Sequence, residues 1–248
     1  MSFPNTIYGK PGWEKKQTSD QRHKLGTRMA FADGRAYRYV KAGGTLAPGK
    51  LIQAPATDAA DDMDLAWSAG GGAGETTITT GTSLTITKDQ YKEGWLYKND
   101  ENDEGHLYPI KGNTAVSSAA GCVFTIDEED GFKTASSATT DLFGVLYNIY
   151  DGVIVQPTTI TNAAVGVGTA AVTDDYYSWI QTWGPAAVLD YGATWVGGDQ
   201  ITSAESTNAG AATLLDSSSA QDNQSVGYSM YIKPATTDYG FVYLTIAP

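Results

Sequence analysis

Short runs of branched and aromatic residues, separated by turn residues, recur along most of the chain. The pattern is clearest after residue 153, where Gly-Pro, Gly-Gly-Asp, Asn-Ala-Gly and Thr-Asp-Tyr-Gly separate the runs. Short strands at nearly regular spacing are typical of a β-sandwich or β-barrel. Both faces of residues 240–246 are apolar, which predicts a buried strand or one whose second face meets a neighbouring subunit. The strands expected in this part are 153–157, 176–183, 186–189, 200–203, 211–215, 225–233 and 240–246.

Two hairpins are predicted in the first half of the chain. Asp33-Gly34 lies between two short apolar runs, and this dipeptide favours a type I′ turn, in which both central residues need positive φ. Residues 95–97 and 107–110 are aromatic and aliphatic, and they flank the acidic stretch 100–105, DENDEG. This second pattern predicts a hairpin with a charged, solvated tip.

Two further segments give weaker patterns. Residues 62–67 alternate, which predicts a short strand with Met63, Leu65 and Trp67 packed inside and Asp62 turned outward. The stretch 115–147 is the one place where a short helix is expected, because part of it is weakly periodic. Long stretches of good helix formers are otherwise scarce.

The composition supports the same class of fold. The chain has 248 residues, enough for a substantial core, with 11% aromatic and only 18% charged residues. We therefore expect an all-β protein, a β-barrel or β-sandwich with an extended N-terminal arm and at most one or two short helices. The boundaries predicted are an arm 1–24, a small β unit with a Gly-rich linker 25–75, hairpins with a possible short helix 76–143, and a C-terminal β-barrel 144–248.

Charge is distributed unevenly. Residues 1–50 contain ten Lys and Arg against three acids, a net charge of +7, whereas residues 51–248 carry −19. Prolines and glycines in residues 1–22 favour an extended segment, and Tyr8 and Trp13 have no periodic neighbours to pack against. Such a segment either binds an acidic partner or docks on its own acidic body. The strongly acidic remainder disfavours binding to nucleic acid.

Candidate chemistry is sparse. The chain has two histidines and one cysteine, Cys122, which excludes a disulfide within the chain, HExxH and any site that needs three His ligands. DENDEG lacks the EF-hand residues at the fifth and twelfth positions, and a looser calcium site on that loop remains an alternative. Residues 166–171 match GxGxxA, but a strand rather than a helix is expected to follow. We expect no enzymatic activity, no cofactor and no resident metal.

Targeting signals are not evident in the sequence. The first residues have no apolar run typical of a signal peptide, and no stretch approaches the roughly 20 apolar residues of a membrane span. The expectation is a protein made in a cytosol, without a membrane partner.

Four phrases together resemble the head decoration, or capsid cement, proteins and related virion structural proteins of tailed bacteriophages. The phrases are LGTRMAFADGRAYRYVKAG (25–43), QYKEGWLYKNDENDEGHLYPIKGN (90–113), YYSWIQTWGPAAVLDYGATWVGGDQI (176–201), and VGYSM (226–230) with YGFVYLTI (239–246). The resemblance implies an all-β protein on the outer surface of a capsid, made in the host cytoplasm. Its partner would be the major capsid protein, and a homo-oligomer, most often a trimer, would be expected. The family has no catalytic signature.

The functional residues expected from these arguments fall into two sets. Capsid attachment is assigned to the basic and aromatic residues Tyr8, Lys10, Trp13, Lys15, Lys16, Arg22, Lys24 and Arg28. The barrel core or an oligomer interface is assigned to Tyr177, Trp179, Trp183 and Trp195. Two other functions remain open: a fibre or adhesin module that binds glycans through the Trp/Tyr face, and a tail or head–tail connector component.

Overall fold

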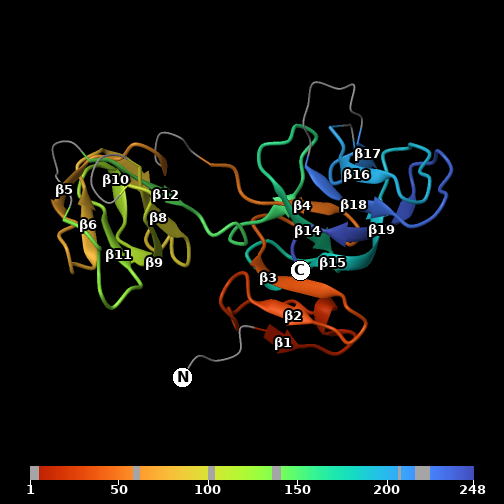
Figure 1. Ribbon diagram of the computed structural model, residues 1–248, viewed down its shortest axis with the longest axis horizontal. Helices are drawn as coiled ribbons and strands as arrows, with labels where there is room; N and C mark the ends of the chain where they lie inside the picture. Colours follow the sequence, from red (N-terminus) through yellow and green to blue (C-terminus); the bar gives the residue numbers. More distant parts are fainter. Residues whose placement is uncertain (1–5, 58–61, 100–103, 136–140, 206–207, 216–223) are drawn as a thin grey trace. The chain divides into compact units, whose positions relative to one another are not determined.

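The computed structural model describes residues 6–57, 62–99, 104–135, 141–205, 208–215 and 224–248. About 45% of the residues lie in strands, and no helix of seven or more residues is present in the described ranges. The all-β prediction is therefore confirmed. Two compact units are formed: unit 1 comprises residues 1–56 and 149–248, and unit 2 comprises residues 57–148 (Figure 1).

Unit 1 is built around one large sheet whose central strand, β15 (Tyr177–Leu189), is 13 residues long. The main strand order is β1-β2-β3-β15-β19-β18-β16-β17, and β14 pairs with both β15 and β4, which in turn pairs with β13. Its other strands are β1 (Thr6–Tyr8), β2 (Arg28–Ala30), β3 (Ala36–Lys41), β4 (Leu51–Gln53), β13 (Ile154–Val155), β14 (Ala164–Gly168), β16 (Gln200–Ser203), β17 (Ala212–Leu214), β18 (Ser225–Ser229) and β19 (Tyr239–Thr245).

β15 is long because different partners occupy different parts of it. β3 pairs with residues 177–183 and β19 pairs with residues 183–189, both antiparallel. β14 pairs at residues 180 and 181. Residues 178–182 of β15 are all buried, and from residue 183 onward burial alternates with the two-residue period of a strand, so one face enters the core and the other is partly open to solvent.

The predicted C-terminal barrel is not closed, and the fold is sandwich-like. β17 meets the end of β15 through an isolated parallel bridge between Asp190 and Ala212 and not through a ladder. A single bridge cannot join two strands into a continuous wall, because closure requires a staggered register along whole strands.

Unit 2 contains a six-stranded sheet of order β12-β8-β9-β11-β6-β5 and a two-stranded sheet, β10-β7. The hairpin predicted around the acidic tip is confirmed, since Leu96 pairs with Tyr108. The tip itself, 100–103, lies outside the described residues. The strands are β5 (Trp67–Gly70), β6 (Thr77–Thr80), β7 (Leu84–Ile86), β8 (Trp95–Lys98), β9 (Leu107–Asn113), β10 (Val116–Ala119), β11 (Val123–Ile126) and β12 (Phe143–Leu146).

The short helix expected within 115–147 is wrong for the described residues there, which form β10, β11 and β12. Alternating burial explains the result: Phe124 and Ile126 are buried on β11, and Phe143 and Val145 on β12. These side chains join the core of unit 2, which is made only of residues between Leu65 and Val145.

The domain boundaries also differ from those expected at 24/25, 75/76 and 143/144. Residues 25–56 belong to unit 1, because β3 pairs with β15 across more than 130 positions of sequence. The N-terminal residues 6–24 belong to unit 1 as well. Unit 2 is therefore an insertion between two parts of unit 1, and each unit buries its own apolar clusters.

Candidate functional site

The N-terminal segment is hydrogen-bonded to unit 1 from residue 6 onward. β1 pairs in parallel with β2, in register from Thr6 opposite Arg28, and the amide of Gly9 donates to the carbonyl of Ala30 at 3.0 Å. A Cβ at Gly9 would lie 2.4 Å from the Phe31 ring, so only glycine allows this approach. The sequence predicted either a free arm or a segment that docks on its own body. For residues 6–9 the structure shows the docked arrangement.

A short 3₁₀ turn, η1 (Trp13–Lys15), holds the next part of the segment. Gly12 precedes it with φ of 95°, and its amide donates to the carboxylate of Glu14 at 2.6 Å. Beyond the turn, Thr18 and Tyr177 exchange two backbone hydrogen bonds of 2.8 and 2.9 Å. Between the 3₁₀ turn and Thr18, the segment lies against β15 and lines a pocket together with Tyr39 of β3.

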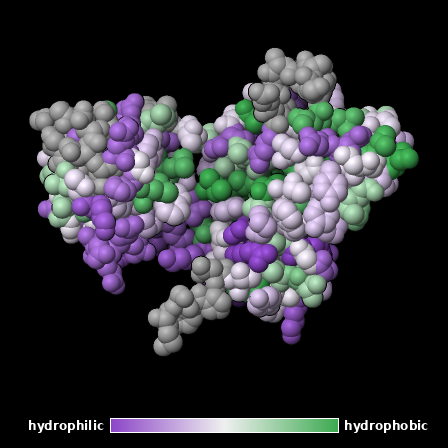
Figure 2. Space-filling view, viewed as in Figure 1, coloured by the Kyte–Doolittle hydropathy of each residue, from purple (hydrophilic) through white to green (hydrophobic). Residues whose placement is uncertain are grey.

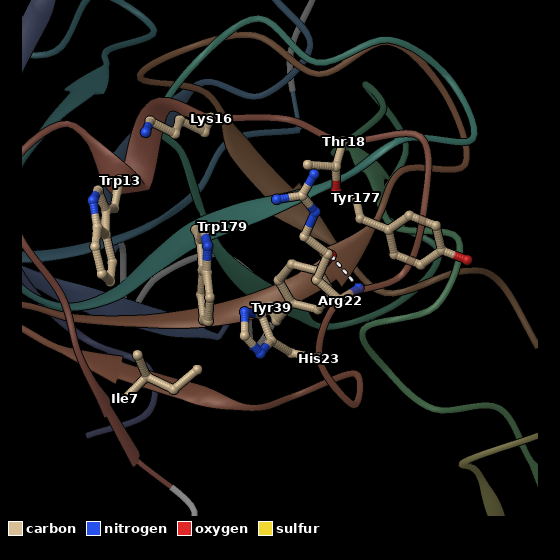
Figure 3. Close-up of a pocket in the computed structure, with 9 residues that line it drawn as sticks. All are labelled: Ile7, Trp13, Lys16, Thr18, Arg22, His23, Tyr39, Tyr177 and Trp179. Atoms are coloured by element: carbon tan, nitrogen blue, oxygen red, sulfur yellow. Dashed lines mark hydrogen bonds between the residues drawn. The ribbon is translucent and has the colours of Figure 1, made fainter.

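A pocket of about 240 Å³ opens under this segment (Figure 3). Its walls come from the N-terminal segment, from Tyr39 on β3 and from Tyr177 and Trp179 on β15. In Figure 3 the indoles of Trp13 and Trp179, which both line the pocket, are seen nearly edge-on. The lining residues are Ile7, Trp13, Lys16, Thr18, Arg22, His23, Tyr39, Tyr177 and Trp179.

The floor of this pocket is a contiguous aromatic cluster. The ring centroids of Tyr39 and Trp179 are 5.0 Å apart, and Tyr39 stacks on Tyr177 at 5.9 Å with an interplanar angle of 13°. His23 packs edge-on against Tyr39 at 5.1 Å. The hydroxyl of Tyr39 accepts a hydrogen bond from the amide of Arg22 at 3.1 Å. These contacts fix the floor in one arrangement, as aromatic edge and offset contacts do.

The rim of the pocket is cationic. The side chains of Lys16 and Arg22 are exposed, and neither forms an ion pair with a carboxylate among the described residues. Burial, and then the charge of Arg22, hold the pKa of His23 below its usual 6.5, so His23 is neutral at pH 7. A pocket with rigid aromatic walls and two free cations suits a ligand or partner group that combines an anionic group with a flat or apolar one.

The structure brings three of the eight predicted attachment residues, Trp13, Lys16 and Arg22, into this pocket. Tyr8 is 82% exposed on β1, and Arg28 is half-buried on β2. Lys10, Lys15 and Lys24 are exposed along the same segment. Together these eight residues form what we call the N-terminal surface.

The four residues assigned to the core or an oligomer interface separate into three places. Trp195 is fully buried, and the ammonium of Lys233 lies 5.6 Å from its ring. Tyr177 and Trp179 line the pocket. Trp183 is half-buried and packs edge-on against Tyr243 at 6.0 Å. Only Trp195 is purely a core residue.

Sequence reasoning missed His23 and Tyr39 as site residues. The available signal was the alternation in residues 36–41, which places Tyr37 and Tyr39 on one face of a strand. No local signal indicates that Trp13 and Trp179 line one pocket, because long-range contacts bring these segments together: Thr18 pairs with Tyr177, and the Thr169 hydroxyl donates to the carbonyls of Glu14 and Trp179.

The acidic residues concentrate in unit 2. Unit 2 has five Lys and Arg against sixteen acids, a formal net charge of −11, whereas unit 1 has eleven against twelve, a net charge of −1. The basic N-terminal surface therefore belongs to a unit that is nearly neutral as a whole. The positive charge of residues 1–50 is offset by acids elsewhere in unit 1, and most of the net negative charge of the chain lies in unit 2.

Other kinds of site find little support in the described residues. No group of three or more His, Cys, Asp and Glu side chains is placed there to hold a metal ion. Across that same part of the chain, no helix is long and apolar enough to cross a membrane. Comparisons with protein-family models, with curated proteins and with solved structures give no match.

Proposed function

We propose that the protein is a non-enzymatic structural protein of a bacteriophage virion, a head decoration protein that binds the outer capsid surface and stabilises the capsid lattice. The observation that supports this best is the N-terminal surface, where exposed cations and aromatics are held on a sheet by backbone hydrogen bonds. Ordered presentation matters because a surface that is already folded loses less conformational entropy on binding.

The proposed partner is an acidic patch of the major capsid protein. Lys16 and Arg22 would face carboxylates, and an apolar or aromatic side chain of the partner would enter the pocket that Trp13 and Trp179 help to line. Each exposed ion pair contributes only about 0.2–1 kcal/mol. A lattice with many equivalent sites makes such weak contacts sufficient when the bound protein is multivalent.

Unit 2 fits the solvent side of such an assembly. Its net charge of −11 opposes close approach of further copies and disfavours nonspecific aggregation. Attachment to the capsid would then depend on residues of unit 1. We propose, on the same grounds, that the virion exterior is where the protein is located.

Binding to undecorated capsids tests the proposal. The double variant Lys16→Glu, Arg22→Glu is expected to bind on the order of tenfold more weakly than the wild type, and the wild-type affinity should fall as salt rises. Lys111→Glu, an exposed charge reversal on β9 of unit 2, is the matched control and should bind normally. Equal binding by the double variant and the wild type would refute attachment through the N-terminal surface.

The number of copies of the protein in each virion distinguishes a cement protein from a connector component. A cement protein is present across the whole lattice, whereas a connector is present as a single ring.

Glycan binding is a second candidate, favoured by the two indoles that face the pocket. Flat aromatic rings stack on the C–H faces of sugars, and Lys16 and Arg22 would add affinity for an acidic sugar. Trp13→Ala is the informative variant, because Trp13 is 41% exposed and its loss leaves the floor intact. Two results together would favour the adhesin function over the cement function: the wild type binds glycans but not capsids, and Trp13→Ala loses the glycan binding.

A further inference from the structure

A second surface of unit 1 lies on β15, β19 and β18, beyond the part of β15 that lines the pocket, and its outward residues are uncharged. Three adjacent strands, β15, β19 and β18, present one face to solvent beyond residue 183. Cross-strand pairs place Ala187 beside Phe241 and Tyr228 beside Tyr243 on this face. We call it the aromatic face; its residues are Trp183, Pro185, Ala187, Leu189, Tyr228, Tyr239, Phe241 and Tyr243.

The opposite sides of the same strands are fully buried. Val242 and Leu244 on β19 and Val226 on β18 are 0% exposed and belong to the core. The outward residues are large and yet exposed: Tyr228 at 41%, Phe241 at 43% and Tyr239 at 46%. Soluble β-sheets usually alternate apolar inside with polar outside, so a sheet that is aliphatic on its inner face and aromatic on its outer face needs cover on the outer one.

Neighbouring residues extend the aromatic face. The chain that follows β18 exposes Met230, Tyr231 and Ile232, the last at 70%, and Tyr231 packs on Phe241 at 6.5 Å. Figure 2 shows this region, which Figure 1 labels β18 and β19, mainly in pale and green shades, those of intermediate and apolar residues.

Charge is scarce on β18, on β19 and in the chain between them, whereas Ala187 on β15 lines a pocket together with Glu14, Lys15 and Arg35. Between residues 225 and 245 the only charged side chains are Lys233 and Asp238. Lys233 is buried and paired with Asp190 at 2.7 Å, so it does not contribute to the surface. Asp238 accepts a hydrogen bond from the amide of Tyr239 at one end of β19.

We propose that the aromatic face is the contact surface between copies of this chain. A second copy fits because it brings the same uncharged, aromatic surface, which a two-fold interface can match to itself. The N-terminal surface cannot pair in this way, because its exposed cations would face one another. Interfaces between identical subunits are also the most apolar class.

The available area matches that of a stable interface. With about 150–250 Å² for each large side chain, the exposed parts of Tyr228, Met230, Tyr231, Ile232, Tyr239 and Phe241 provide roughly 430–720 Å² of mainly apolar surface. A standard interface covers about 800 Å² on each partner, of which about 65% is apolar between identical subunits, or about 500 Å². Each copy therefore exposes enough apolar surface to form its own side of a contact between subunits.

Sedimentation velocity of the full-length protein over a range of concentrations tests the inference. The wild type is expected to be oligomeric, and Phe241→Asp should weaken self-association on the order of 100-fold, because a charge replaces a central apolar contact. Tyr239→Lys is a second variant at an exposed position, in case the first fails to fold, as judged by circular dichroism. Leu107→Asp, at a 53% exposed position of unit 2, is the matched control and should leave association unchanged.

A wild type that stays monomeric at every concentration would overturn the inference, as would folded Phe241→Asp or Tyr239→Lys protein that associates like the wild type. A monomer that instead binds a different protein through this face also overturns it, in favour of that partner. The experiment uses the purified protein alone, so its result is independent of the capsid-binding experiment.

Discussion

Gly240 shows how closely the strands of unit 1 are fitted around Trp195. A Cβ at Gly240 would lie 1.9 Å from Cζ3 of the indole, which is itself fully buried and has no room to move. Gly240→Ala is expected to lower the free energy of unfolding by about 1–3 kcal/mol or more, the range found for overpacked cores. Chemical denaturation measures the change. Gly44→Ala is the control, because its Cβ would meet Ile154 at an ordinary 3.6 Å, and a similar loss in both variants would contradict the argument.

His23 makes the stability of unit 1 depend on pH in a defined direction. Its pKa is lowered from 6.5, first by burial against Tyr39 and Trp179 and second by the charge of Arg22. The unfolded chain therefore binds a proton more readily than the folded one, and His23 contributes stability above pH 6.5 that is lost as the pH falls through the folded pKa. His23→Gln should reduce the loss of stability between pH 7.5 and 5.5, as measured by denaturant unfolding.

An NMR titration checks the same prediction directly. The chain has only two histidines, and His23→Gln identifies the signal of His23. Arg22→Gln should raise the pKa of His23 only in part, because burial is the larger cause. A folded pKa at or above 6.5 in the wild type would contradict it.

Single residues also show where sequence reasoning stops. Asp62 was expected to turn outward, yet it is 2% exposed and accepts a hydrogen bond from the hydroxyl of Tyr91. Met63, expected to be packed, is 51% exposed. The partner of Asp62 lies 29 positions away, so alternation within residues 62–67 cannot reveal it. By contrast, Leu65 and Trp67 are buried as predicted, because apolar burial needs no specific partner.

At the scale of elements, hairpins were predictable from local residues, and their exact turns were not. β2 and β3 pair around Asp33-Gly34 as expected. Gly34 has φ of 87°, but Asp33 does not take positive φ, so the turn is not type I′. The amide of Phe31 donates to the carbonyl of Arg35, which closes a three-residue loop with glycine in the left-handed position. The side chain of Asp33 instead binds Arg35 at 2.8 Å.

The aromatic face was partly visible in the sequence, whereas the pocket was not. The two apolar faces of residues 240–246 predicted either burial or a neighbouring subunit, and the structure leaves one face exposed. The pocket depends on a segment whose prolines and glycines gave no strand pattern. Parallel strands such as β1 and β2 must be joined by a connection of many residues. The alternation of apolar and polar residues within a short segment cannot predict such a pairing.

At the scale of the whole molecule, the insertion of unit 2 follows from long-range pairing alone. β4 lies before the insertion and β13 after it, and they pair antiparallel with Gln53 opposite Ile154. A methyl at Gly152 would reach within 4.0 Å of Pro55, so the chain leaves and re-enters unit 1 at neighbouring points. A run of four Asp in residues 58–64 follows the first boundary, but it marks no change of strand pattern, and residues around 148/149 show no comparable change in composition, so the boundaries were placed elsewhere.

The insertion predicts that either unit folds without the other. A fragment of residues 57–148 has its own closed apolar cluster, including Trp67, Tyr91 and Phe124, and should unfold cooperatively. A deletion variant, in which a short Gly/Ser linker joins Ala56 to Ile149, should also fold, since closing a short loop between adjacent ends costs little. A fragment of residues 76–143 is the matched control: it lacks β5, the partner of β6, and all of β12 except Phe143, so it should show no cooperative transition. Thermal unfolding followed by circular dichroism distinguishes these outcomes, and a fragment 57–148 without a transition would show that its core needs unit 1.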